Sequence, residues 1–186
     1  MNWANYKLGL KKENKEKELI EGCISNKRKA QKELYDKYSS AMFTIALRMS
    51  GNRDDAHDIL QEVFIQVFND IKSFKRISTL GAWIKTITVR TSIRKIKKRI
   101  IFDDLTEEKD LPQIKPDIHI NMDYLEKSIN DLAEGYRTVF LLVEVEGYSH
   151  KEVAKLLEIS EGTSKSQLFY AKKLLRKKLS TYSIGE

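Results

Sequence analysis

The residues that cross-link, kink or turn a backbone are scarce in this sequence. The chain of 186 residues has one cysteine, two prolines and eight glycines. A single cysteine, Cys23, excludes an internal disulfide, so nothing argues for an oxidising compartment. The shortage of glycine and proline disfavours a turn-rich β sandwich and favours helices joined by short connections. We expect Cys23 to be a small apolar residue on the first helix.

Long apolar runs are absent as well. The N-terminal segment 1–18 lacks the uninterrupted apolar stretch of a signal peptide. The longest runs elsewhere, such as 139–143, are far shorter than the roughly 20 residues that span a bilayer. We therefore expect no stable membrane insertion and a cytoplasmic location.

No grouping of residues indicates catalysis or metal binding. The three histidines, His57, His119 and His150, are dispersed and have no metal-ligand spacing. Acidic residues cluster on helix faces and in one loop without a companion nucleophile. We expect no catalytic residue, no metal ligand and no cofactor, so an enzyme such as a recombinase or nuclease fits the sequence poorly.

Positive charge is concentrated in two blocks that contain no acid. Residues 72–99 hold ten basic side chains, and residues 163–179 hold six. Because the net charge of the whole chain is only +7, the remaining residues are acidic on balance. A solvated surface normally mixes both signs, whereas separate single-sign blocks suit contacts with a polyanion. The charge pattern therefore predicts two nucleic-acid-binding surfaces.

Apolar periodicity predicts helices through most of the first hundred residues. Asn52 is suited to cap a helix whose first turn carries Asp54 and Asp55. An apolar stripe then recurs every three or four residues, at Leu60, Val63, Phe64, Val67, Phe68 and Ile71. After a basic and polar loop at 73–79, a second helix is expected from about 80 to 99.

The first of these two helices also carries a mixed face. Asp58, Gln61 and Glu62 share one side of the helix with Ile65, because 3.6 residues make one turn. A purely polar face would indicate ordinary solvation. An apolar residue among the acids suits a docking surface better.

Composition changes sharply after Phe102. The stretch 103–117 contains both prolines and many acids with little periodicity, which indicates a linker. We therefore predict an all-α fold of two small helical domains, 1–100 and 122–186. An acidic, proline-containing linker at 101–121 would join them.

The pattern that begins at Gly147 is typical of a helix-turn-helix. Ser149 and Glu152 form a capping box that opens a short helix, and Ser160 caps a longer one running to about Leu179. The second helix of this motif enters the major groove by its N-terminal end. Side chains there that suit base edges or phosphates are Thr163, Ser164, Lys165, Ser166 and Gln167.

Two stretches resemble a known family. The string DDAHDILQEVFIQVF, followed by Phe74, Trp83 and a basic helix, is similar to the promoter-melting domain of bacterial sigma factors. Residues 132–168 resemble their promoter-upstream domain. Two domains with a short linker and no third domain resemble the extracytoplasmic-function branch. The resemblance covers about 19–179 and implies a factor that directs RNA polymerase to promoters and assists strand opening.

The resemblance also implies roles for individual residues. Asp58, Gln61 and Glu62 match family positions that dock on the largest polymerase subunit, and Ile65 shares their face. Positions implied to face the −10 element are Phe74, Lys75, Arg76, Ser78, Thr79, Trp83, Lys85, Thr86, Arg90 and Arg94. Positions implied to contact the −35 element are Thr163, Ser164, Lys165, Ser166, Gln167, Phe169 and Tyr170. Lys173 lies further along the helix, where a cation suits the DNA backbone.

Some positions depart from the family pattern. Arg90 stands where asparagine is usual, and Arg76 or Ile77 where glycine is usual, which bears on the −10 sequence recognised. Glu158 occupies the common position of a turn glycine, and Ser164 replaces a β-branched residue. Both bear on the details of the turn.

A repressor or a membrane-surface protein would account for less of the sequence. A conventional helix-turn-helix repressor or activator would explain the C-terminal half but neither the 58–65 face nor the first basic block. Residues 94–102 have some chemistry of a membrane-surface helix, although a DNA-facing helix accounts for them better. Trp83 fits a core position as well as a DNA contact. The expected partners are RNA polymerase core enzyme, promoter DNA and, by resemblance, an anti-sigma factor, with no small-molecule substrate.

Overall fold

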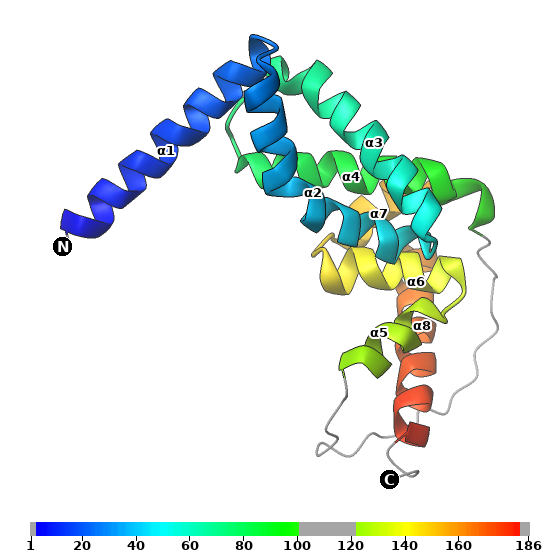
Figure 1. Cartoon of the computed structure of the whole chain (residues 1–186). Helices are drawn as coiled ribbons and strands as arrows, with labels where there is room; N and C mark the ends of the chain where they lie inside the picture. The colour runs from blue at the N-terminus through cyan, green and yellow to red at the C-terminus, as the bar shows by residue number, and fades with distance from the viewer. Residues whose placement is uncertain (1–2, 101–121, 183–186) are drawn as a thin grey trace. The chain divides into compact units, whose positions relative to one another are not determined.

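The computed structural model describes residues 3–100 and 122–182, and within them the chain is helical with no strand (Figure 1). The prediction of an all-α fold is confirmed. Contacts group the chain into two compact units, Met1–Ser92 and Ile93–Glu186. The predicted linker at 101–121 lies outside the described residues. Within the described ranges, no helix has the length and apolar character needed to cross a membrane.

The first unit is built from long helices. They are α1 (Trp3–Ile24), α2 (Arg28–Ser50), α3 (Arg53–Asp70) and most of α4 (Leu80–Ile96), with a short 3₁₀ turn at Ile71–Ser73. The end of α4 and the 3₁₀ turn that follows it, Lys97–Arg99, belong to the second unit. In Figure 1, α2 and α3 lie side by side and run in opposite directions. The C-terminal part of α1 packs on α2.

The core of this unit is the apolar stripe that the sequence predicts. On α3 it contains Leu60, Val63, Phe64 and Val67, all buried. Cys23 of α1 lies in the same core, as expected for a small apolar residue. Burial raises the pKa of its thiol, and Glu33 raises it further. The thiol is therefore held in its neutral form within the core.

Two residues reverse the chain between α2 and α3. Gly51 adopts a left-handed conformation (φ 66°) and its N–H donates to the carbonyl of Leu47 at 2.8 Å. Asn52 then caps α3, because its Oδ1 accepts from the N–H groups of Asp54 and Asp55 at 2.8 and 3.0 Å. The predicted N-cap is confirmed, and it fixes where α3 begins.

The second unit consists of shorter helices around one long one. They are α5 (Met122–Asn130), α6 (Glu134–Phe140), α7 (His150–Leu157) and α8 (Glu161–Tyr182). The sequence predicts one helix over 136–145, but the structure has α6 followed by a wider π turn at Leu141–Val145. Leu132, Ala171 and Leu175 form a core between α8 and the α5–α6 connection.

The helix-turn-helix is capped as predicted. The Ser149 hydroxyl accepts from the N–H of Glu152 at 3.3 Å, and the carboxylate of Glu152 accepts from the N–H of Ser149 at 2.8 Å. The hydrogen bonds from the Ser149 hydroxyl, and next from its backbone, lower the pKa of Glu152. At the start of α8, Ser160 Oγ accepts from the N–H of Thr163 at 2.9 Å.

Glu158 ends α7 in a strained conformation. Its φ is 59°, in the left-handed region, and its N–H donates to the carbonyl of Ala154. Glycine adopts this conformation without the Cβ penalty, which explains why it is common at this position.

A pair of substitutions tests the strain at Glu158. We expect Glu158→Gly to be more stable than Glu158→Ala by about 0.5–1 kcal/mol, because both remove the carboxylate and only glycine relieves the backbone. Urea unfolding of the full chain measures the difference. Equal midpoints for the two variants would contradict the left-handed turn.

Candidate functional site

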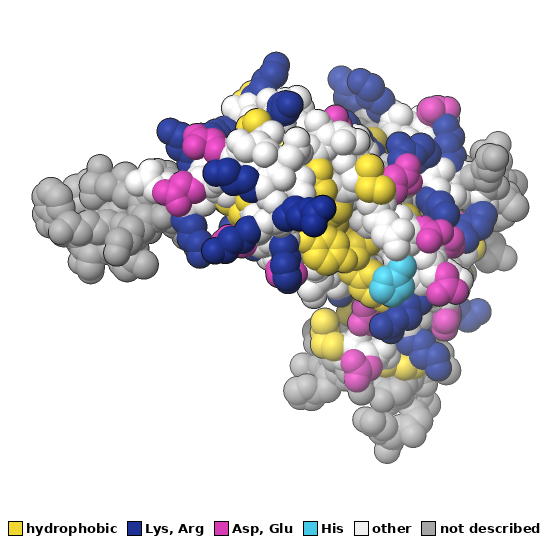
Figure 2. Space-filling model, turned by 45° about the horizontal axis from the view of Figure 1, so that its top comes forward, with side chains coloured by type: hydrophobic (Ala, Val, Ile, Leu, Met, Phe, Trp, Pro, Cys, Tyr) yellow, Lys and Arg dark blue, Asp and Glu magenta, His cyan; other side chains and the backbone are white. Residues whose placement is uncertain are grey.

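The outer face of α3 carries the four residues predicted to dock on a protein. Asp58, Gln61 and Glu62 are exposed, and Ile65 is 63% exposed while its apolar neighbours on the helix are buried. Figure 2 shows other apolar side chains that reach the surface among Lys and Arg side chains. The structure therefore places the four on one exposed face, with an apolar residue amid carboxylates.

The loop between the 3₁₀ turn and α4 is exposed on its outer side and anchored at both ends. Phe74 is half-buried, packs against the core, and its ring centroid lies 5.3 Å from that of Trp83. Thr79 Oγ1 accepts from the N–H of Ala82 at 3.2 Å and so caps α4. Between these anchors, Ile77 is 88% exposed, and Arg76 has a φ of 56°. The family resemblance leads one to expect glycine at Arg76 or Ile77, and the left-handed conformation is at Arg76.

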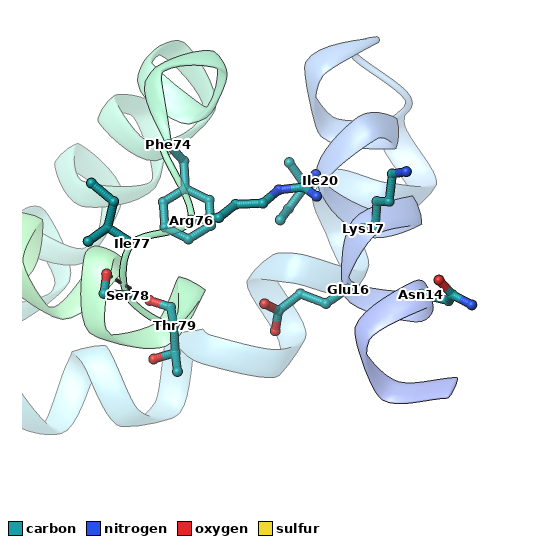
Figure 3. Close-up of a pocket in the computed structure, with 9 residues that line it drawn as sticks. All are labelled: Asn14, Glu16, Lys17, Ile20, Phe74, Arg76, Ile77, Ser78 and Thr79. Atoms are coloured by element: carbon teal, nitrogen blue, oxygen red, sulfur yellow. Dashed lines mark hydrogen bonds between the residues drawn. The ribbon is translucent and has the colours of Figure 1, made fainter. Parts of the chain in front are cut away.

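A cavity of about 760 Å³ opens between this loop and α1 (Figure 3). Phe74, Arg76 and Thr79 line it from the loop, and Glu16 and Ile20 line it from α1. Both walls belong to the first unit. No pattern in the sequence pointed to α1 as a wall, because the contact joins residues far apart along the chain.

The residues of α4 predicted to face DNA differ in their exposure. Arg90 and Arg94 are exposed, whereas Trp83, Lys85 and Thr86 are half-buried. Trp83 packs against the core through part of its ring system, so the core interpretation holds for part of this side chain. The remainder of the ring stays accessible. Aromatic and cationic side chains together are what binding of unpaired bases requires.

On α8 the structure separates the predicted DNA contacts into two sets. Lys165 and Ser166 are exposed, and Phe169 is 44% exposed. Thr163, Tyr170 and Lys173 are half-exposed. These six predicted residues therefore reach solvent, and Phe169 and Tyr170 touch edge to face at 5.4 Å.

The prediction of DNA contacts is wrong for Ser164 and Gln167. Ser164 is fully buried and its hydroxyl is hydrogen-bonded to Nδ1 of His150 on α7 at 2.9 Å. Gln167 is only 2% exposed. At 3.6 residues per turn, Ser164 begins the buried stripe that continues through Leu168 and Ala171, and Gln167 lies on its flank. Polar side chains within the packing cannot reach a base edge.

One signal in the sequence pointed to the burial of Ser164. The family resemblance leads one to expect a β-branched residue there, which is typical of a packed position.

Lys172 forms an ion pair within the protein. Its Nζ lies 2.8 Å from a carboxylate oxygen of Glu144 in the π turn. Among the described residues, no group of three or more His, Cys, Asp or Glu side chains could hold a metal ion.

Comparisons with known proteins agree with this geometry. The family model for Sigma-70 region 2 matches residues 34–100, and the model for Sigma-70, region 4 matches 122–175. The chain is 29% identical over 161 residues to the ECF RNA polymerase sigma factor SigE of Mycolicibacterium smegmatis. The aligned region covers 81% of this chain and 62% of the length of SigE. It is 30% identical over 156 residues to the ECF RNA polymerase sigma factor SigX of Bacillus subtilis, covering 77% of the chain and 80% of SigX.

A solved structure shares the fold. The sigma factor RpoE of Bartonella quintana, in complex with the anti-sigma factor NepR, matches with a TM-score of 0.50 and 22% identity, over 80% of this chain and 96% of RpoE. The two family models match in the order in which the helical parts follow one another, which favours a sigma factor over a conventional repressor. The chain therefore belongs to the extracytoplasmic-function branch of the RNA polymerase sigma factors, the proteins that direct the polymerase to promoters in transcription initiation.

Proposed function

We propose that promoter recognition is divided between the two helical parts of the chain. Residues 1–100 dock on the core polymerase, recognise the −10 element and assist melting, and residues 122–186 bind the −35 element, with 101–121 as the linker. The protein has no bond chemistry of its own in this scheme, because the polymerase makes the RNA. It works in the cytoplasm, where promoter DNA lies.

The exposed Ile65 face of α3 supports the docking assignment. An isoleucine that is 63% exposed on an otherwise well-packed helix gains free energy when a partner covers it, at about 25 cal/mol per Å² of apolar surface. Asp58 and Glu62 beside it attract a basic partner surface and set its register. An apolar centre with charges around it is the usual anatomy of a protein interface.

The cavity between α1 and the 74–79 loop is the observation that carries the melting assignment. Its volume of about 760 Å³ is within the usual size range of small-molecule pockets. Unstacking a base from a duplex costs a few kcal/mol, and stacking on an aromatic side chain returns about 1–3 kcal/mol. Phe74 offers such a ring, and exposed Lys75 and Arg76 offer cations for the neighbouring phosphates.

The exposed residues at the start of α8 support −35 binding. Lys165 and Ser166 are adjacent and lie near the N-terminal end, which is the end of a recognition helix that enters the major groove. Lys165 suits guanine, and Phe169 one turn later suits the methyl group of thymine. Lys173 lies further along the helix, where a cation reaches the phosphate backbone.

We also infer that an anti-sigma factor restrains this protein. RpoE of Bartonella quintana, whose fold this chain shares, is solved with the anti-sigma factor NepR. A partner that covers the exposed α3 face and the DNA-facing side chains would block both contacts at once.

Reversing one charge on α3 tests the docking assignment. Glu62→Lys should weaken binding to core polymerase by about thirtyfold, because leaving an interfacial charge unpaired costs about 2 kcal/mol or more. Glu126→Lys on α5 makes the same change in net charge and should bind normally. Titration of labelled protein with core enzyme measures both, and circular dichroism verifies folding. Unchanged affinity for Glu62→Lys would mean that this face does not dock.

The separation of exposed from buried residues on α8 makes a second test. Lys165→Ala and Ser166→Ala should alter which −35 sequences the holoenzyme selects from a promoter library. Gln167→Ala should leave that selection unchanged, because its side chain is buried. Lys173→Ala should weaken all sequences alike and reduce the salt slope by about one. If Gln167→Ala changed the selected −35 sequences, Gln167 would have to contact DNA.

The loop assignment predicts a defect in strand opening alone. A Gly/Ser replacement of 75–78 that retains Thr79, the cap of α4, should leave polymerase binding and closed-complex formation nearly intact. Open complexes, followed by permanganate reactivity of unpaired thymines, should fall sharply. A premelted bubble template should restore part of the activity, since the unpairing cost is removed. Normal opening of linear promoters by this variant would exclude the loop.

A further inference from the structure

The wall of the cavity that α1 contributes is held firmly in place. Leu19 and Ile20 of α1 are buried in the core of the first unit. Two ion pairs join α1 to α2, Lys15–Glu33 at 3.6 Å and Glu16–Lys37 at 3.8 Å. The buried Leu19 and Ile20 hold this part of α1 against the core, whereas the ion pairs, which join largely exposed side chains, add little.

Glu16 is the acidic group that this wall turns toward the loop. Figure 3 shows its carboxylate pointing toward the loop, whereas Asn14 and Lys17 point away from it. Glu16 is half-buried, and Lys37 lies nearest to one of its two carboxylate oxygens. Arg76 extends from the opposite wall toward α1. The cavity therefore has an aromatic ring, a cation and a carboxylate around one opening.

A carboxylate in a DNA-binding cavity is selective, because it accepts hydrogen bonds and donates none. Adenine, cytosine and guanine each carry an exocyclic amine that can donate to it. Thymine has no such amine, and its single donor, N3–H, lies between two carbonyl oxygens that repel a carboxylate. An acid here therefore disfavours thymine relative to the other three bases.

We propose that Glu16 determines the specificity of base capture, accepting a hydrogen bond from the exocyclic amine of the captured base and rejecting thymine. The inference rests on the proposed capture of a base by the 74–79 loop. Phe74 stacks on the base, Arg76 holds a phosphate, and Glu16 reads the amine from the α1 wall.

Selection from random single-stranded DNA tests the role of Glu16. The holoenzyme is incubated with a pool of short random oligonucleotides, and the bound fraction is sequenced. Wild-type protein should deplete thymine about five- to tenfold at one position of the enriched motif. Glu16→Gln should remove that depletion, because the amide N–H₂ donates to the carbonyl oxygen of thymine. The other positions of the motif should not change.

Two control variants separate reading from structural support. Glu18→Gln neutralises an exposed carboxylate on the same helix and should keep the depletion of thymine. Lys37→Met breaks the ion pair with Glu16 and should also keep the depletion of thymine. If Lys37→Met relaxed the selection as far as Glu16→Gln, Glu16 would act only by holding α1, and the proposal would be overturned.

The loop variant distinguishes failure of this inference from failure of base capture. The Gly/Ser replacement of 75–78 should abolish all preference at the thymine-depleted position. If it does and Glu16→Gln still excludes thymine, base capture stands and Glu16 is not the reader. If the loop replacement leaves the whole motif unchanged, base capture by this loop is itself wrong.

Discussion

Burial of one stripe of α3 positions the rest of the first unit. Once Leu60, Val63 and Val67 face the core, the 3.6-residue repeat turns Glu62 and Ile65 outward. The Gly51–Asn52 reversal fixes the register of α3 against α2. The end of α3 then fixes where the loop toward α4 begins. The exposed Ile65 face of α3 and the starting point of the 74–79 loop are thus two consequences of one packing arrangement.

Burial of one helix stripe also shapes the second unit, and it determines which polar residues of α8 are accessible to a partner. α8 buries a stripe that includes a serine, so hydrogen-bonding capacity there is used within the protein, between Ser164 and His150. Polar side chains one position away, Lys165 and Ser166, face solvent. Side-chain chemistry alone therefore does not identify a DNA contact. The angular position of the residue on the helix has to be known as well.

Local rules were sufficient for the helices and their caps. Periodicity predicted α3 and α8, and the Asn52 cap and the Ser149–Glu152 box have the expected hydrogen bonds. The errors arose where tertiary packing decides. Ser164 has the chemistry of a DNA-contacting residue, but it is buried. No local pattern shows that α1 lies across from the 74–79 loop. The π turn after α6 could not be predicted either, because the prediction assumed a regular repeat of 3.6 residues per turn.

Arg76 and Glu158 have a backbone conformation that is uncommon for residues other than glycine. Both have a positive φ, 56° and 59°, although each carries a Cβ that disfavours it. Such a conformation costs of order 1 kcal/mol and persists only where the surrounding structure enforces it. At Arg76 the enforcing structure is the anchored loop, held by Phe74 at one end and Thr79 at the other. The side chain at this strained position places a guanidinium on the rim of the cavity.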